Sequence, residues 1–320
     1  MPTGLGWDFK TWYQNSQWEA APYKDRKYSA ALYSKEGGIA TITLNRPEKR
    51  NALNDAMFND LMAGLHQASH DHGVRAVVIR GAGTNFSSGH DLSSPPQEES
   101  TPIPPGLNPT LRDYYGVERR RCGKYEDILD FPKPLIARVH GRCIGAAQAI
   151  VYACDLVIAS TDAAFGVRGF NRFFLHISDW QGLWPGGSYK QFAGHLTPVM
   201  TAEEAEAIGL INKAVPPARL DSEVASWAEA LAALPTGAFA VAKRWLTGVA
   251  DIAGQTMSLR CHYAGHLNVQ YVRFRPDEVN FYRVRRDRKT LKGFIDERAR
   301  VYVDEPGRAA SSPDWSAKES

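Results

Sequence analysis

The segment LIARVHGRCIGAAQAIVYACDL, residues 135–156, is the clearest indicator of the fold class, and AVVIRGAGTNFSSGHDL, residues 76–92, repeats its pattern. In each, a short apolar strand runs into a glycine-bearing turn and then into a helix. The turns are made of small residues: Ser87, Ser88 and Gly89 in one segment, and Gly145, Ala146 and Ala147 in the other. Small side chains let a ligand approach the backbone, and free N–H groups at a helix start attract negative charge. Two such amides converging on one point would form an oxyanion hole, whereas spacing alone favours the simpler interpretation of tight helix–strand packing.

Short strands and helices alternate on both sides of these segments. Apolar or period-two runs predict strands at 28–34, 38–45, 75–80 and 156–159, the first two joined as a hairpin through Lys35-Glu36-Gly37. Helical spacing predicts helices from Asn54 onward, over 111–129 and over 146–153, and a capping box runs from Thr201 to Glu204. This alternation predicts an α/β fold.

The chain changes character after Pro217, where the pattern becomes almost entirely helical. Helices are expected at 221–234, 236–250, 254–270 and 277–300. We therefore divide the chain into an N-terminal arm at 1–27, a core at 28–217, a helical region at 218–304 and a flexible tail at 305–320.

Composition excludes several classes of protein. The 320 residues carry 38 basic and 35 acidic side chains, a net charge of +3 that requires neither nucleic acid nor an acidic membrane as partner. The chain has no apolar run long enough to cross a bilayer and no apolar signal core near its start. Four scattered cysteines without a CxxC pair fit a reducing cytoplasm. No metal site is expected, because the pairs His66/His70 and His262/His266 lack a glutamate and a clear third ligand.

Several ordered motifs carry a family resemblance. They are ITLNRPEKRNALN (42–54), RAVVIRGAGTNFSSGHDL (75–92), KPLIARVHGRCIGAAQAIVYACDLVIAS (133–160), AAFG (163–166), MTAEEAEAIGLINKAVP (200–216) and KGFIDERARVY (292–302). Together they resemble the crotonase superfamily, the enoyl-CoA hydratase/isomerase family. The resemblance implies a crotonase-type spiral of ββα repeats, followed by a helical C-terminal oligomerisation region that assembles homotrimers or homohexamers. It also implies an acyl-CoA substrate bound near the subunit contacts.

The resemblance places an oxyanion hole on the backbone N–H groups of His90 and Ala146. Ala146 takes the middle position of the family's usual Gly-Gly-Gly, and the hole stabilises the oxyanion of a thioester carbonyl. One such donor lowers the barrier by roughly 3–4 kcal/mol. Lys49 and Arg50 are expected at the CoA phosphates, with a further contact from the basic helix 283–300 of a neighbouring subunit. Further substrate contacts are expected from Ala52, Ser88, Gly89, Asp91, Leu92, Gly145 and Gln148.

Two polar residues near the second turn have alternative interpretations. Gln148 could donate a hydrogen bond into the pocket or simply cap a turn. His140 occupies the end of the strand, where the family often has Asn or His, and its simpler interpretation is structural.

The acid–base residues depart from the family pattern. Hydratases place one glutamate after the second turn and another after a Phe-Gly pair, and these positions hold Ala149 and Gly169 here. Neither side chain can move a proton. Water addition by the usual glutamate pair is therefore not expected.

Some relatives instead use an aspartate further along the loop that here spans 165–187, where Asp179 is the only acidic residue. Asp179 stands later than the resemblance expects, so an insertion is assumed. Aromatic neighbours would raise its pKa by desolvation and suit it to act as general acid or base, with His176 as a partner. A surface carboxylate that caps a turn is the alternative. Phe170, Trp180 and the other aromatic residues of the loop suit a cyclic or aryl acyl group, or else a contact between subunits.

These expectations converge on an enzyme that acts on an acyl-CoA thioester through an enolate or related oxyanion. The expected reaction is C–C or ring hydrolysis, isomerisation, lyase chemistry or an atypical hydration, with no cofactor beyond the CoA of the substrate. A β-diketone hydrolase of the same fold, which needs no CoA, is one alternative. A non-catalytic or RNA-binding relative is the other, suggested by the missing glutamates and opposed by the weak net charge.

Overall fold

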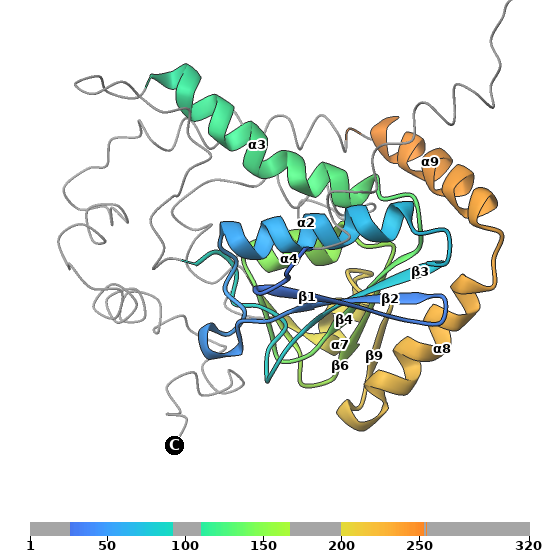
Figure 1. Ribbon diagram of the computed structural model, residues 1–320. Coiled ribbons are helices and arrows are strands. Elements are labelled where there is room, and N and C mark those ends of the chain that lie inside the picture. The colour runs from blue at the N-terminus through green and yellow to red at the C-terminus, as the bar shows by residue number, and fades with distance from the viewer. Residues whose placement is uncertain (1–25, 92–109, 167–199, 253, 255–320) are drawn as a thin grey trace, which may run out of the picture.

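The computed structural model describes residues 26–91, 110–166, 200–252 and 254 (Figure 1). The large sheet holds, in spatial order, β1 (Ala31–Glu36), β2 (Ile39–Leu44), β3 (Ala76–Gly81), β4 (Leu135–Val139), β6 (Leu156–Ser160) and β9 (Lys213–Val215). A second sheet holds β5 (Arg142–Ile144), β7 (Ala164–Gly166) and β8 (Met200–Thr201). In the large sheet β1 pairs antiparallel with β2, and the other neighbours are parallel. The α/β class predicted from the alternating pattern is confirmed.

Helices cover both faces of the large sheet (Figure 1). On one face lie α2 (Asp55–His70) and α4 (Ala146–Tyr152), with α3 (Leu111–Leu129) stacked on their outer side. On the opposite face lies α8 (Leu220–Ala232), which leads into α9 (Thr236–Ile252). The remaining described helices are α7 (Ala202–Ala207) and the 3-10 turns η2 (Pro47–Lys49) and η3 (Pro217–Arg219).

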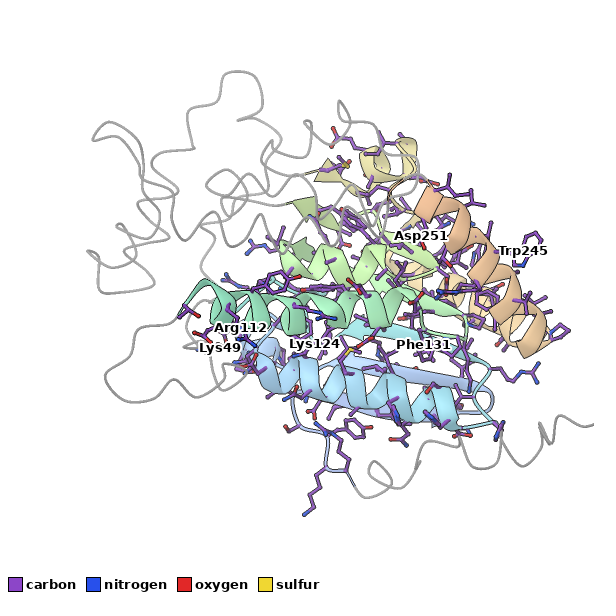
Figure 2. All side chains as sticks on the ribbon, turned by 90° about the horizontal axis from the view of Figure 1, so that it is seen from above. Lys49, Arg112, Lys124, Phe131, Trp245 and Asp251 are labelled. Atoms are coloured by element: carbon purple, nitrogen blue, oxygen red, sulfur yellow. The ribbon has the colours of Figure 1, made fainter. Side chains whose placement is uncertain are left out.

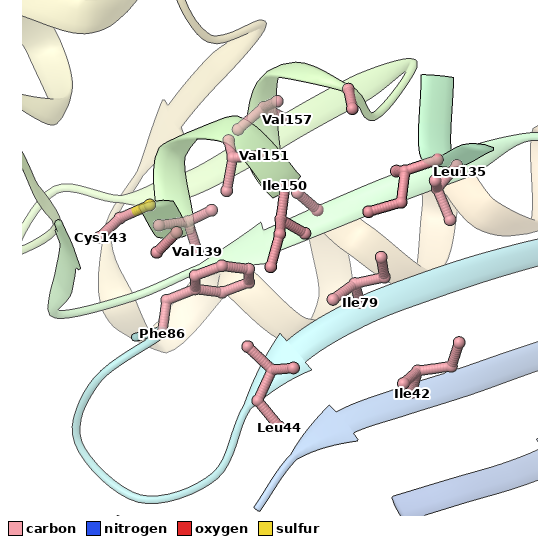
Figure 3. Packing of buried hydrophobic residues seen from close by; sticks show 14 of the residues in the cluster. Ile42, Leu44, Ile79, Phe86, Leu135, Val139, Cys143, Ile150, Val151 and Val157 are labelled. Carbon is pink, nitrogen blue, oxygen red and sulfur yellow. The ribbon is translucent and has the colours of Figure 1, made fainter. Parts of the chain in front are cut away.

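Each parallel strand contributes side chains to two separate cores, because successive side chains of a strand point to opposite sides. Val77 of β3 joins the core under α2 and α4, whereas Val78 joins Ile136 and Ile158 under α8. Figure 3 shows the first core, with the ring of Phe86 among side chains from β3, β4 and α4. Since both faces are covered, β3, β4 and β6 are apolar at most of their positions.

The β1–β2 hairpin is tighter than predicted. Glu36 still belongs to β1 and pairs with Ile39, so the loop is Gly37–Gly38 rather than Lys35-Glu36-Gly37. Gly37 has a φ of +55°, which glycine adopts readily. The last residues of β1 are polar and exposed, so they carried no apolar signal for a strand.

Side chains at the helix starts confirm two predicted boundaries. Asn54 accepts a hydrogen bond from the Met57 N–H at the start of α2. At α7 the predicted capping box of Thr201 with Glu204 is confirmed, and Thr110 forms an equivalent box at α3. These local bonds explain why α2 and α7 begin where the sequence indicated.

Two of the four helices predicted after Pro217 fall within the described residues, and α8 and α9 confirm them. The predicted helices at 254–270 and 277–300 lie outside the described residues, as does the predicted tail at 305–320. Among the described residues no single helix is long and apolar enough to cross a membrane. The segments Pro217–Ala232 and Gly237–Ile252 are long and apolar enough only when they are counted together, and they are bent by 103° relative to each other.

Candidate active site

Two turns meet at the edge of the sheet where the chain leaves β3 and β4. Ser87 and Cys143 pair there as an isolated parallel β-bridge. Ser87 N donates to Arg142 O at 2.9 Å, and Ile144 N donates to Ser87 O at 3.0 Å. The carboxyl ends of neighbouring parallel strands share one edge, so the topology brings together the two turns that the sequence showed separately.

Gly89 makes the close contact between the two turns. Its φ is +83°, and a Cβ added there would lie 2.5 Å from Ile144 O and 3.3 Å from Ala146 N. Since Cβ atoms essentially never come within 3.0 Å of such an atom, the contact requires glycine. The close approach sets the peptide that follows Gly89 beside the start of α4.

The two proposed donor amides point away from the bonds that hold their turns. Leu53 N donates to Gly89 O at 2.8 Å, and Asp91 N donates to Leu53 O at 2.9 Å. In such a parallel bridge the middle residue, here His90, directs its own N–H to the opposite side. Ala146 is the first residue of α4, and no described residue accepts a hydrogen bond from its N–H. This arrangement suits an anionic oxygen atom.

Gly145 shapes the second turn. Its φ is +58° and its ψ is −127°, a backbone conformation that residues other than glycine rarely adopt. Its N–H donates to Gly166 O at 2.8 Å, which ties the turn to β7. Because Gly145 directly precedes Ala146, its conformation sets the direction of the Ala146 amide.

Asn51 is a buried support of the first turn that the sequence analysis did not single out. Its Oδ1 accepts from Arg46 N at 2.9 Å, and its Nδ2 donates to Ala82 O and Asn85 O, each at 2.8 Å. Its carbonyl oxygen accepts from Ser87 Oγ at 2.7 Å. Asn51 has a φ of +52°, which asparagine tolerates better than most residues. The signal was an asparagine within RNALN, but its partners Ala82, Asn85 and Ser87 lie far away in the chain.

The predicted CoA-phosphate residues lie on the loop that supports the first turn. Ser88 N donates to Arg50 O at 2.9 Å, and Ser88 Oγ donates to Lys49 O at 3.5 Å. The side chains of Lys49 and Arg50 are exposed, and Figure 2 shows where Lys49 lies. The structure therefore places two cations on the segment that contacts the turn of Gly89, which suits an anionic ligand.

Asp91 and Ala52 serve the fold of this loop. Asp91 pairs with Arg46 at 2.9 Å, and its side chain is only 6% exposed. Arg46 Nη1 also donates to Ala52 O at 2.7 Å, and Ala52 is buried. This geometry favours a positioning role for both residues over the substrate contact predicted from the resemblance.

Gln148 faces the protein interior. Its Nε2 donates to Cys143 O at 3.2 Å, and its Oε1 accepts from Tyr152 Oη at 2.8 Å. The turn-capping alternative therefore fits Gln148 better than a contact with substrate. Ala149, the next residue, packs in the core, so α4 presents no carboxylate at this point.

His140 stabilises the loop after β3. Its Nε2 lies 2.8 Å from Gly83 O, and its Nδ1 lies 2.9 Å from Arg138 Nη1. Burial lowers the pKa of His140, which favours a neutral ring that donates from Nε2 and accepts at Nδ1. These contacts support the structural interpretation of this histidine.

α3 brings two further residues to the Phe58 ring, which lies beside His90. The Phe58 ring lies 6.2 Å from the His90 ring and 5.8 Å from the Tyr125 ring. Lys124 Nζ lies 5.4 Å from the centre of the Phe58 ring. Figure 2 labels Lys124 on α3. The sequence analysis missed Lys124 and Tyr125, since they belong to a helix without any local motif.

The predicted acid–base residues lie outside the described residues, and their roles stay predictions. These acid–base residues are Asp179 and His176. Leu92, Gly169, Phe170, Trp180 and the basic closing helix 283–300 also lie outside the described residues.

No metal centre is found in the described part of the chain. His66 and His70 stack with 4.2 Å between ring centres, and His70 Nδ1 lies 2.9 Å from His66 O. No group of three or more His, Cys, Asp or Glu residues that could hold an ion occurs among the described residues. His262 and His266 lie outside them.

Comparisons with known proteins agree on one family. The family profile described as enoyl-CoA hydratase/isomerase matches residues 34–259. The chain is 34% identical over 248 residues to a "probable enoyl-CoA hydratase" of Rhodobacter capsulatus, which covers 75% of this chain and 90% of that protein. It is 32% identical over 206 residues to the 1,2-epoxyphenylacetyl-CoA isomerase of Escherichia coli K12, covering 63% and 75%. A crystal structure of an enoyl-CoA hydratase/isomerase from Xanthobacter autotrophicus Py2 has a TM-score of 0.72 and 30% identity, covering 86% of this chain and 99% of that one.

Proposed function

This chain belongs to the enoyl-CoA hydratase/isomerase family and is a crotonase-type enzyme, and we propose that the N–H groups of His90 and Ala146 hold the thioester oxygen of an acyl-CoA substrate. The observation that carries this proposal is the contact of Gly89 with the turn at Ile144 and Ala146, because it sets two backbone segments side by side. The parallel bridge between Ser87 and Cys143 supports it further.

The proposed chemistry begins at the thioester carbonyl. Its oxygen gains negative charge when the adjacent carbon loses a proton or when the carbonyl carbon is attacked. Two preorganised amides stabilise that charge without reorganising, and each lowers the barrier by roughly 3–4 kcal/mol. Lys49 and Arg50 are proposed to neutralise the CoA phosphates, which their exposure beside Ser88 supports.

Proton transfer is proposed to come from the 165–187 loop rather than from α4. The methyl side chain of Ala149, buried in the core, supports this assignment. Asp179, assisted by His176, is the proposed acid or base. Isomerisation, lyase chemistry, C–C or ring hydrolysis and atypical hydration remain the proposed reactions, because each can pass through a thioester oxyanion.

The proposed acyl group is bulky and cyclic or aromatic. Phe170 and Trp180 are proposed to contact it, since both belong to the aromatic loop. Similarity to an isomerase named for 1,2-epoxyphenylacetyl-CoA supports an aryl group. CoA enters as part of the substrate, and the proposed chemistry uses no other cofactor. We also propose a cytoplasmic location. The free thiols of Cys143 and Cys154 support it, because thiols stay reduced in the cytoplasm.

The proposed assembly is a homotrimer or homohexamer, and α9 supports it. On the inner side of α9, Lys243 pairs with Asp155 at 3.0 Å and is nearly buried. The outer side carries an exposed apolar stripe: Val241, Trp245, Leu246, Val249 and Ile252. Figure 2 shows Trp245 on this outer side. A surface helix normally turns its apolar side inward, so a second copy of the chain is the proposed cover.

Incubation with a panel of aliphatic, alicyclic and aryl CoA thioesters, read by mass spectrometry, tests the function. Hydration and hydrolytic ring opening add one water, whereas isomerisation leaves the mass unchanged. Ala146→Pro removes the proposed donor amide and should lower turnover by roughly 100-fold or more. Ala146→Gly keeps the amide and should retain most of the turnover.

Three outcomes would overturn the proposal. Near-normal turnover by a folded Ala146→Pro variant would refute the oxyanion hole. Hydrolysis of a β-diketone without saturable CoA binding would replace it with the CoA-independent hydrolase. Salt-dependent RNA binding without acyl-CoA turnover would replace it with the non-catalytic relative.

A further inference from the structure

Helix α4 carries two buried polar side chains one turn apart, Gln148 and Tyr152, which are 1% and 8% exposed. Tyr152 Oη donates to Gln148 Oε1 at 2.8 Å, and Gln148 Nε2 donates to Cys143 O at 3.2 Å. The two side chains therefore form a short relay that ends on a backbone carbonyl. Their helix neighbours Ile150 and Val151 are fully buried and apolar.

The relay ends immediately before the second turn of the active site. Cys143 precedes the peptide of Ile144, whose carbonyl oxygen contacts Gly89. Between Cys143 and Gln148 the chain passes through Gly145, with a φ of +58°. Glycine has more backbone conformational freedom than any other residue. A hydrogen bond from α4 back to Cys143 therefore bridges the most flexible residue of the turn.

We propose that Gln148 and Tyr152 are positioning residues that set the direction in which the Ala146 N–H points. This inference rests on the proposed oxyanion hole. Gln148 ties the start of α4 to β5 at Cys143. Tyr152 holds the Gln148 amide group so that its NH₂ faces the Cys143 carbonyl.

The chemistry of the two groups fits this role. Burial raises the pKa of Tyr152 well above its ordinary value, so the hydroxyl stays protonated and remains a donor. A buried amide or hydroxyl without a partner is unfavourable, and each of these groups supplies the other's partner. Breaking the relay leaves Cys143 O without this donor from α4 and lets the Gly145 turn relax.

Acetoacetyl-CoA is a suitable probe, because its enolate absorbs in the near ultraviolet and carries the negative oxygen that the hole would hold. The wild-type protein should raise the enolate fraction of bound acetoacetyl-CoA. Tyr152→Phe removes only the hydroxyl oxygen. Gln148→Met removes both hydrogen bonds of the relay while keeping a side chain of similar length. At saturation both variants should reduce the ratio of bound enolate to bound ketone by roughly tenfold, with the Kd of CoA itself nearly unchanged.

Val151→Ala is the matched control, since it weakens the core on the same helix without touching the relay. It should lower the Tm and leave the enolate ratio at the wild-type value. If the relay variants lower only the Tm, as this control does, the positioning role is refuted. Tyr152→Phe decides the question should Gln148→Met fail to fold. If the wild-type protein binds acetoacetyl-CoA without forming enolate, the proposed oxyanion hole itself fails, and the inference fails with it.

Discussion

Gly89→Ala should push the two turns apart and disable the proposed oxyanion hole. The added Cβ would lie 2.5 Å from Ile144 O, whereas ordinary contact begins at 3.4 Å, so the gap must widen by roughly 0.9 Å. Ile144 O is a backbone atom and cannot rotate away. Misplacing catalytic groups by roughly 1 Å costs roughly 100-fold in rate, which is the expected loss of turnover. The φ of +83° adds strain of roughly 1–3 kcal/mol to the folded state.

Gly37→Ala separates that strain from the misalignment. Gly37 has a φ of +55° in the β1–β2 hairpin, and an added Cβ would meet nothing within 4 Å. It should lose stability to a similar degree and keep full turnover. Thermal unfolding, turnover and enolate formation from acetoacetyl-CoA should be measured for both variants. Wild-type turnover by a folded Gly89→Ala protein, or an equal loss of turnover in Gly37→Ala, would show that the contact of Gly89 with Ile144 does not align the two amides.

Other predictions concern stability, assembly and proton transfer. Lys133→Met should destabilise the protein to urea by roughly 1–3 kcal/mol, because Lys133 Nζ donates to Ala68 O at 2.6 Å and Asp71 O at 2.7 Å at the end of α2. Burial lowers the pKa of Lys133 to about 8, and the unfolded chain, with a pKa of about 10.4, binds more protons between these values. Stability should therefore rise with pH across this window in the wild type relative to Lys133→Met, and parallel curves for the two proteins would contradict this. Trp245→Glu should lower the mass measured by light scattering from that of a trimer or hexamer, whereas Trp245→Phe should not. An unchanged mass for Trp245→Glu would argue against a second copy on α9. Asp179→Asn should reduce turnover by roughly 100- to 10,000-fold and leave acyl-CoA binding nearly unchanged, and full activity would assign proton transfer to another group.

Local signals predicted many of the described elements. The helix predicted at 111–129 is observed as α3, because Thr110 caps its start and the spacing of apolar residues is regular. The β1–β2 loop was misplaced, since Lys35 and Glu36 are exposed at the edge of the sheet and read as a polar turn. Ser34, Lys35 and Glu36 are all exposed, so neither an apolar run nor an alternation marks the end of β1 as a strand.

The active site was predictable only in part. The resemblance pointed to His90 and Ala146, and the structure brings their turns together. It gave Gln148 two alternatives, because the conformation of the Gly145 turn decides which way this side chain points. It gave Asn51 no role, because its partners Ala82 and Asn85 are distant in the chain. Lys124 and Tyr125 had no signal at all, since only the packing of α3 on α2 brings them near Phe58.

The α/β class, the positions of both glycine turns and the presence of alanine rather than glutamate at position 149 follow from the amino-acid sequence alone. These depend on residue type and on periodicity along the chain, which are local properties. Two contacts are seen only in the folded protein: Gly89 with the turn at Ile144, and Gln148 with Cys143. The first contact depends on the order of the strands in the sheet, and the second depends on the backbone conformation of the Gly145 turn. Periodicity records neither.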